Sequence, residues 1–162
     1  MKKLNLIFRS CGFTLIELIA VIIIITIAAM IAVPMLGSSA GTQIRSAADL
    51  ITSDLEYAKS MAISTQRTHT VIFDESAESY KITDANGVIP HPLTNKDYVI
   101  SFKADKSLSR VDIVDADFGS AEQVSFNHLG SPDNGGSVTL SAGTKNMTVS
   151  VEAVTGFISI SP

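Results

Sequence analysis

The sequence predicts an α+β protein, in which a long N-terminal helix, membrane-spanning in its first half, packs on a predominantly antiparallel β-sheet or a β-sandwich. Three patterns predict this architecture. Residues 13–36 are almost uninterruptedly apolar, residues 42–65 repeat apolar residues at three- and four-residue steps, and the chain from residue 66 alternates polar and apolar residues in short segments. A helix followed by strands in series favours a sheet with the helix on one face.

The apolar run of residues 13–36 accounts for an unusual composition. The 162 residues are 46% hydrophobic but only 17% charged, whereas average proteins are about 25% charged. Its 24 residues would extend about 36 Å as a helix, which exceeds the roughly 30 Å of a hydrocarbon core. Lys2, Lys3 and Arg9 precede the run without any acidic residue, so we expect a cytoplasmic N-terminus and an exported remainder.

Two other interpretations of this run stay open. A buried core helix is disfavoured, because continuous apolar runs of 18 or more residues are typical of membrane spans. A cleaved secretory signal has an apolar region of about 7–15 residues before a small-residue cleavage site. Ser38, Ser39 and Ala40 would supply such a site, and cleavage after Ala40 would release a soluble domain.

Glu17 is the one charged residue of the run. A carboxylate in a membrane span costs several kcal/mol unless it finds a partner, and such residues are functional by default. Nothing else in the run can pair with it, so we expect a partner from another protein subunit. A signal peptide that is discarded has no use for such a residue.

The residues around Glu17 carry a specific resemblance. The segment from Gly12 to Leu18, with its basic leader and the apolar run behind it, resembles the type III signal of type IV pilins and type II secretion pseudopilins. The resemblance implies cleavage between Gly12 and Phe13 by a prepilin peptidase, and N-methylation of Phe13 by the same enzyme. It also implies that Pro34 kinks the helix.

The same resemblance implies how subunits would dock. Cleavage creates a cationic amine on Phe13, and in the filament Glu17 of one subunit would neutralise that amine on its neighbour. Two desolvated charges are costly apart and tolerable together, so the pair would set the axial register. The implied partners are the prepilin peptidase, other pseudopilins or pilins, and an inner-membrane assembly platform.

Two segments are expected between the membrane and the strands. The small residues 37–41 predict a hinge. Residues 42–65 predict an amphipathic helix with a single apolar stripe, formed by Ile44, Ala47, Ala48, Ile51, Leu55, Ala58 and Ala62. The alanines of this stripe favour close packing against a sheet.

Eight short segments of the remaining chain read as strands. They are His69–Phe73, Ser79–Thr83, Tyr98–Phe102, Val111–Val114, Gln123–Asn127, Ser137–Leu140, Asn146–Val151 and Phe157–Ile160. Turn-forming residues separate several of them, as in residues 84–87, 130–136 and 142–143.

This part of the chain resembles a narrower group, the H class of minor pseudopilins (the GspH/FimT family) and the FimT-like minor pilins. The resemblance rests on the helix pattern Leu50, Asp54, Leu55, Ala58, Lys59, Ala62, Ile63, and on Val124-Ser125-Phe126, Gly130, Gly135-Gly136, Val138 and Thr155-Gly156. Lys59 stands where the class more often has arginine.

The sequence favours a structural protein over an enzyme. His69, His91 and His128 lack the spacing of a zinc site, and Asp112, Asp115 and Asp117 lack that of a calcium loop. Residues 37–162 hold nine basic and fifteen acidic residues, net −6, which argues against direct nucleic-acid binding. No catalytic set and no cofactor or metal is predicted.

We therefore expect four segments: a leader removed at 1–12, a transmembrane helix at 13–36, a hinge and amphipathic helix at 37–65, and a periplasmic β-rich domain at 66–162. The expected function is that of a minor subunit of a type II secretion pseudopilus in the bacterial inner membrane. The alternatives are a minor type IV pilin in motility, adhesion or DNA uptake, and a secreted soluble domain released after Ala40.

Overall fold

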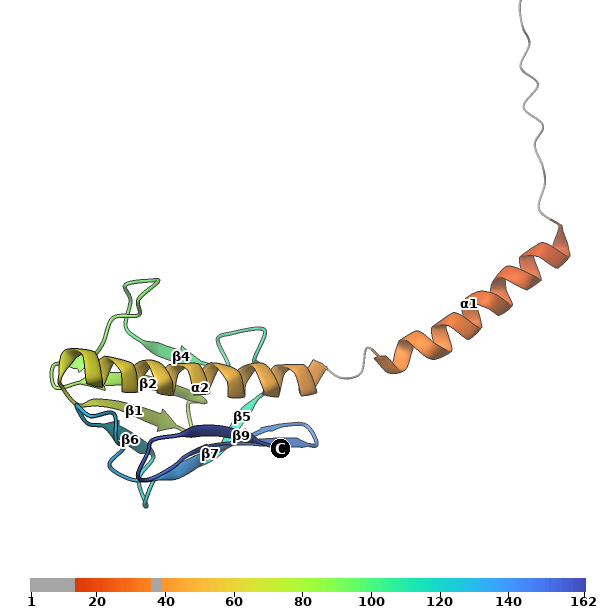
Figure 1. Cartoon of the computed structure of the whole chain (residues 1–162). Helices are drawn as coiled ribbons and strands as arrows, with labels where there is room; N and C mark the ends of the chain where they lie inside the picture. The colour runs from red at the N-terminus through yellow and green to blue at the C-terminus, as the bar shows by residue number, and fades with distance from the viewer. Residues whose placement is uncertain (1–13, 36–38) are drawn as a thin grey trace, which may run out of the picture. The chain divides into compact units, whose positions relative to one another are not determined.

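The computed structural model describes residues 14–35 and 39–162, and the chain divides into two compact units at residues 38 and 39 (Figure 1). In the first unit, helix α1 covers Leu15–Met35. The second unit is a domain of one helix, α2 (Ser39–Thr65), followed by nine strands within residues 39–162.

Helix α2 owes its position to its apolar stripe. Each of the seven residues predicted to form that stripe is at most 1% exposed, and four of the seven are alanine (Ile44, Ala47, Ala48, Ile51, Leu55, Ala58 and Ala62). The repeat of three and four residues places them all on one side of a helix. The prediction of an amphipathic helix packed on a sheet is confirmed.

The beginning of α2 corrects the hinge predicted over residues 37–41. Ser39, Ala40 and Gly41 form the first turn of the helix, and Ala40 packs against the core of the domain. Gly37 and Ser38 lie outside the described residues. Continuity of α1 and α2 in one long helix depends on residues 36–38 and stays a prediction.

The end of α2 has a left-handed cap. Gln66 has a φ of 56°, and the Arg67 backbone N–H donates a 3.2 Å hydrogen bond to the Ala62 carbonyl. This geometry satisfies a carbonyl that the helix end leaves unpaired. It also turns the chain directly into the first strand.

The first sheet contains β1 (His69–Asp74), β2 (Ser79–Asp84), β3 (Gly87–Val88), β4 (Val99–Ser101) and β6 (Gln123–Phe126). Its order is β3-β2-β1-β6, with β4 also paired to β2, and each pair is antiparallel. Val71 lies opposite Ile82 on one side and Val124 on the other. All three are fully buried, because alternate residues of a strand face the core.

The second sheet has the order β5-β7-β8-β9 and is also antiparallel. Its strands are β5 (Asp112–Asp117), β7 (Gly136–Ala142), β8 (Lys145–Val151) and β9 (Ile158–Ser161). The register of β5 shifts between Ile113 and Asp115, as at a β-bulge.

Each of the eight predicted strands has a counterpart in these sheets, with one clear shift. The strand predicted over Val111–Val114 is β5, which begins and ends later. Its bulge places Ile113 and Ala116 in the core, three residues apart, so the two-residue alternation stops at Val114. Strand β3 has only two residues and was not predicted.

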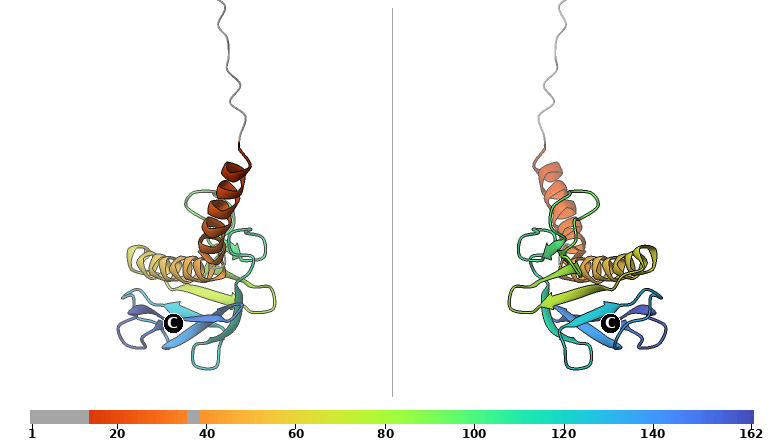
Figure 2. Two further views of the ribbon diagram at one scale, coloured as in Figure 1. Left: turned by 90° about the vertical axis from the view of Figure 1, so that its right-hand side faces the viewer. Right: turned by 90° about the vertical axis from the view of Figure 1, so that its left-hand side faces the viewer.

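Helix α2 runs along the strands of the domain (Figures 1 and 2). It contacts β1 and β6 of the first sheet and β7, β8 and β9 of the second. An aromatic group fills the core beside it, with ring centres of Phe73 and Tyr80 at 5.6 Å and of Phe73 and Phe118 at 5.8 Å. The predicted helix on antiparallel β-structure is confirmed.

Candidate functional site

Helix α1 begins with a side-chain cap next to its only acidic residue. The Thr14 carbonyl accepts hydrogen bonds of 3.1 Å from the backbone N–H groups of Glu17 and Leu18, and the Thr14 hydroxyl oxygen lies 3.3 Å from the Glu17 nitrogen. Threonine is a favoured residue at this position because its oxygen satisfies a backbone donor that the helix leaves free. Glu17 is in the first turn, where the helix dipole favours a negative charge.

The apolar side chains of residues 15–30 are exposed on all sides of helix α1. Leu15, Ile16, Ile24 and Met30 are between 66% and 79% exposed, and residues 14–30 are all classed as exposed. A helix that is hydrophobic all round is stable only when something apolar surrounds it. Within residues 14–35 and 39–162, none of the helices combines the length and the apolar character needed to cross a membrane.

The predicted site residues of the N-terminal segment are described only in part. Gly12 and Phe13, the cleavage and methylation positions, lie outside the described residues. Pro34 is the residue before the last of α1, and its kink stays a prediction, as do the four segment boundaries. The two ion pairs found among the described residues are Arg45–Asp49 and Glu56–Lys59, so neither involves Glu17.

The sequence analysis did not predict a second polar centre inside the domain. Asp54 of α2 is only 5% exposed. Its carboxylate accepts a 2.6 Å hydrogen bond from the Tyr80 hydroxyl and a 2.9 Å one from the Tyr98 hydroxyl. These bonds tie α2 to β2 and to the residue that precedes β4. The position was recognisable, because Asp54 falls on the apolar stripe, three residues after Ile51 and four before Ala58.

The buried centre changes the proton affinities of its members. Burial raises the pKa of Asp54 above its ordinary value, although the hydroxyls of Tyr80 and Tyr98 act in the opposite direction. Burial and the nearby carboxylate also raise the pKa values of Tyr80 and Tyr98. Both tyrosines therefore stay protonated as donors, and the centre serves as an internal brace.

Lys59, which belongs to the predicted helix pattern, binds the loop that connects β8 and β9. Its ammonium group donates a 2.9 Å hydrogen bond to the carbonyl of Gly156, in the connection between β8 and β9. Gly156 in turn lies against Gly130, since a side chain added there would come within 2.9 Å of the Gly130 carbonyl. The motif residues Lys59, Gly130 and Gly156, distant in sequence, thus form one contact.

The other candidates of the sequence analysis are acidic residues and histidines of the domain. Asp112, Asp115 and Asp117 lie along β5, and His69 is buried in β1 while His128 is exposed. Among the described residues, no three histidine, cysteine or acidic side chains are placed so that they could hold a metal ion.

Solved structures of two kinds of protein share the fold. The type IV minor pilin FimU of Pseudomonas aeruginosa is 21% identical, with a TM-score of 0.54 over 75% of this chain and 90% of that one. The minor pseudopilin EpsH of Vibrio cholerae is 9% identical, with a TM-score of 0.56 over 73% and 95%. No curated protein sequence is similar enough to count as a relative.

Two family models cover the sequence itself. Residues 7–33 match the prokaryotic N-terminal methylation motif, which agrees with the resemblance seen around Gly12 and Phe13. Residues 47–155, more than half of the chain, match the type II transport protein GspH. The chain therefore belongs to the GspH family of pilin-like proteins.

Proposed function

We propose that this protein is a minor pseudopilin of a type II secretion system, assembled into a short filament through its N-terminal helix. The observation that carries the proposal is helix α1. It presents exposed apolar side chains all round and a single carboxylate in its capped first turn. Such a helix needs apolar neighbours and a cation, and identical or related helices bearing a free N-terminal amine supply both.

The proposed processing and assembly of the protein take place in three steps. A prepilin peptidase cleaves between Gly12 and Phe13 and methylates Phe13. The protein then waits in the inner membrane, held by residues 13–36, with its domain in the periplasm. An assembly platform finally transfers it into the filament, where other pseudopilins replace lipid around α1. The match of residues 7–33 to the N-terminal methylation motif supports the first step.

A minor type IV pilin is the second candidate function. It is favoured by the fold shared with FimU, and the same N-terminal chemistry would serve it. Deletion of the gene separates the two. Loss of an exported protein from the medium supports secretion, whereas loss of surface pili, adhesion or DNA uptake supports the pilin.

Intact mass of the protein purified from its membrane tests the processing step. The proposal predicts a chain that begins at Phe13 and carries one added methyl group. A chain that begins at Gly41 would instead establish the secreted domain released after Ala40. A chain that still begins at Met1 would contradict both.

Docking is tested with substitutions of Glu17. Glu17→Ala should reduce incorporation into filaments at least tenfold, since it leaves the neighbouring amine without a counter-charge in an apolar surrounding. Glu17→Gln should do the same, because an amide has no charge. Thr26→Val is the matched control on α1, where the Thr26 hydroxyl donates a 2.7 Å hydrogen bond to the Ile22 carbonyl of the same helix. Immunoblots of membranes and sheared filaments measure both pools, and equal incorporation of all variants would refute the docking role.

A further inference from the structure

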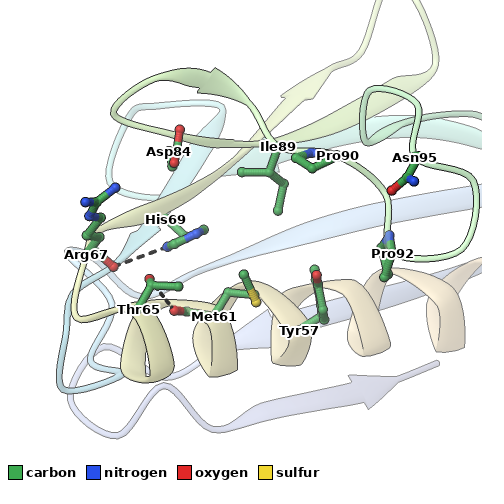
Figure 3. Close-up of a pocket in the computed structure, with 10 residues that line it drawn as sticks. All are labelled: Tyr57, Met61, Thr65, Arg67, His69, Asp84, Ile89, Pro90, Pro92 and Asn95. Atoms are coloured by element: carbon green, nitrogen blue, oxygen red, sulfur yellow. Dashed lines mark hydrogen bonds between the residues drawn. The ribbon is translucent and has the colours of Figure 1, made fainter.

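A pocket of about 350 Å³ lies between the C-terminal half of α2 and the connection from β3 to β4 (Figure 3). We call it the His69 pocket. Its lining includes Tyr57, Met61, His69, Ile89, Pro90 and Pro92. Neither the docking role of α1 nor the GspH family match assigns it a ligand.

The apolar wall of the pocket is preformed. Tyr57 and Met61 of α2 face Ile89, Pro90 and Pro92 across it (Figure 3). The loop that carries Pro90 and Pro92 is closed by its own hydrogen bonds, from His91 N–H to the Lys96 carbonyl at 2.7 Å and from Tyr98 N–H to the Ile89 carbonyl at 2.8 Å. A guest therefore finds a wall that needs little ordering, which favours affinity.

His69 supplies one unused hydrogen-bond acceptor. The residue is only 2% exposed, and its Nδ1 lies 3.2 Å from the Arg67 carbonyl. Because a carbonyl only accepts, Nδ1 carries the proton, and Nε2 of the neutral ring is left as an acceptor. Nε2 has no hydrogen-bond partner among the described residues. Every fully buried side-chain nitrogen or oxygen of these residues does have a partner, so Nε2 is not fully buried. Nε2 therefore opens into the pocket, on the side of the ring away from Arg67 (Figure 3).

The charges around the pocket favour a neutral guest. Hydrogen bonding by the Asn86 backbone lowers the pKa of Asp84, as does the charge of Arg67, so Asp84 is an anion at neutral pH. Arg67 lies on the same side of the pocket as Asp84 (Figure 3). Because Arg67 and Asp84 carry opposite charges, neither a cationic nor an anionic guest gains a net attraction there, and a neutral guest matches the charge of the pocket.

We propose that the His69 pocket binds a tyrosine or tryptophan side chain presented by a neighbouring subunit. The flat apolar body would lie against Met61 and the prolines, since methionine sulfur and aromatic rings attract each other. The phenol O–H or indole N–H would donate to Nε2 of His69. Tyrosine and tryptophan combine an apolar body with a donor and are enriched among residues that dominate interfaces. The identification of a neighbouring subunit as the source of this side chain rests on the proposed function. The ligand chemistry of the pocket is argued from its own residues and does not depend on that function.

The first experiment tests the pocket without any partner. The full chain in detergent micelles, with labelled methionine and isoleucine methyl groups, is titrated with N-acetyl-tyrosinamide while NMR follows Met61 and Ile89. The expected result is saturable shifts of both methyl signals. N-acetyl-phenylalaninamide, which lacks only the hydroxyl, should bind at least fivefold more weakly. Absence of shifts, or equal binding of the two compounds, would overturn the proposal.

The second experiment tests the guest's source. Thr65→Trp places an indole at the pocket lining, and Ser64→Trp is the matched control, because Ser64 is exposed, bonds to the same Met61 carbonyl, and does not line the pocket. We expect Thr65→Trp to reduce incorporation into filaments at least threefold and Ser64→Trp to leave it unchanged. Equal incorporation of the two variants would refute a subunit as the source.

The outcomes also separate this proposal from the function on which it rests. If Glu17→Ala blocks assembly but Thr65→Trp behaves like Ser64→Trp, the pocket proposal fails and the pseudopilin function stands. If Glu17→Ala assembles normally while the tyrosine compound binds selectively, the docking role of α1 fails and the chemistry of the pocket stands.

Discussion

Helices α1 and α2 are both rich in apolar residues but differ in how far these residues are exposed. In α1, the apolar side chains of residues 15–30 are spread all round and exposed, whereas in α2 seven apolar residues form one stripe that is buried in the domain. The stripe gives α2 its partners within the domain. This difference is the reason for assigning α2 to the stability of the domain and for proposing that α1 serves contacts with other molecules.

The strongest test of this comparison truncates one apolar residue on each helix. Leu55→Ala in α2 should lower the free energy of unfolding of the domain by about 2–5 kcal/mol, because it opens a cavity in a packed core. Ile24→Ala in α1 should change it by less than about 0.5 kcal/mol. Denaturant unfolding of the full chain in detergent measures both, followed by near-ultraviolet circular dichroism of the tyrosines. All three, Tyr57, Tyr80 and Tyr98, lie in the domain. An equal loss from both variants would show that α1 also belongs to the folded core.

A smaller effect is expected from the one carboxylate that α2 buries. The pKa of Asp54 is raised in the native state, so above the ordinary value of 3.8 the unfolded chain releases its proton first. The native state then binds more protons, and the free energy of unfolding falls as the pH rises through the window between the two pKa values. Asp54→Asn should flatten this decline.

The measurement is the free energy of unfolding at several pH values from below 3.8 to neutrality. Asp74→Asn is a suitable control, because the hydroxyl of Ser76 lowers the pKa of Asp74. Its contribution is present above 3.8 and lost as the pH falls below that value. An unchanged slope above 3.8 in Asp54→Asn would contradict the raised pKa.

The smallest effect concerns the first turn of α2. Gly41→Ala should stabilise the domain by about 0.5–1 kcal/mol, since glycine is a poor helix former. The three atoms nearest to the added methyl group all belong to the flexible end of the Lys145 side chain, which can move away. Gly143→Ala is the control in the opposite direction, because Gly143 has a φ of 66° that alanine adopts only with strain. If Gly41→Ala instead lowered the stability, residue 41 would not behave as part of a regular helix, and the prediction of a hinge at this position would stand.

Much of the domain was predictable because its patterns are local. The stripe of α2 and the alternation in β1, β2 and β8 depend only on residues near one another in sequence. The bulge in β5 was not predictable from alternation, since it moves Ala116 into the core in place of Asp115. The pair Glu75 and Glu78 shows the same limit. Their carboxylates accept hydrogen bonds from the backbone N–H groups of Ala116 and Ile113 on the edge of the other sheet, which no spacing in the sequence reveals.

The sequence by itself determined the N-terminal methylation motif and the class of fold, because a short motif, an apolar run and periodic patterns depend only on residues that are close in sequence. Only the tertiary structure decided that Asp54 has two tyrosine partners and that His69 opens into a pocket. Both depend on side chains from β2 and the 89–98 segment meeting α2. Burial and hydrogen bonding arise from contacts between segments that are distant in sequence, and a sequence pattern does not show which distant segments come into contact.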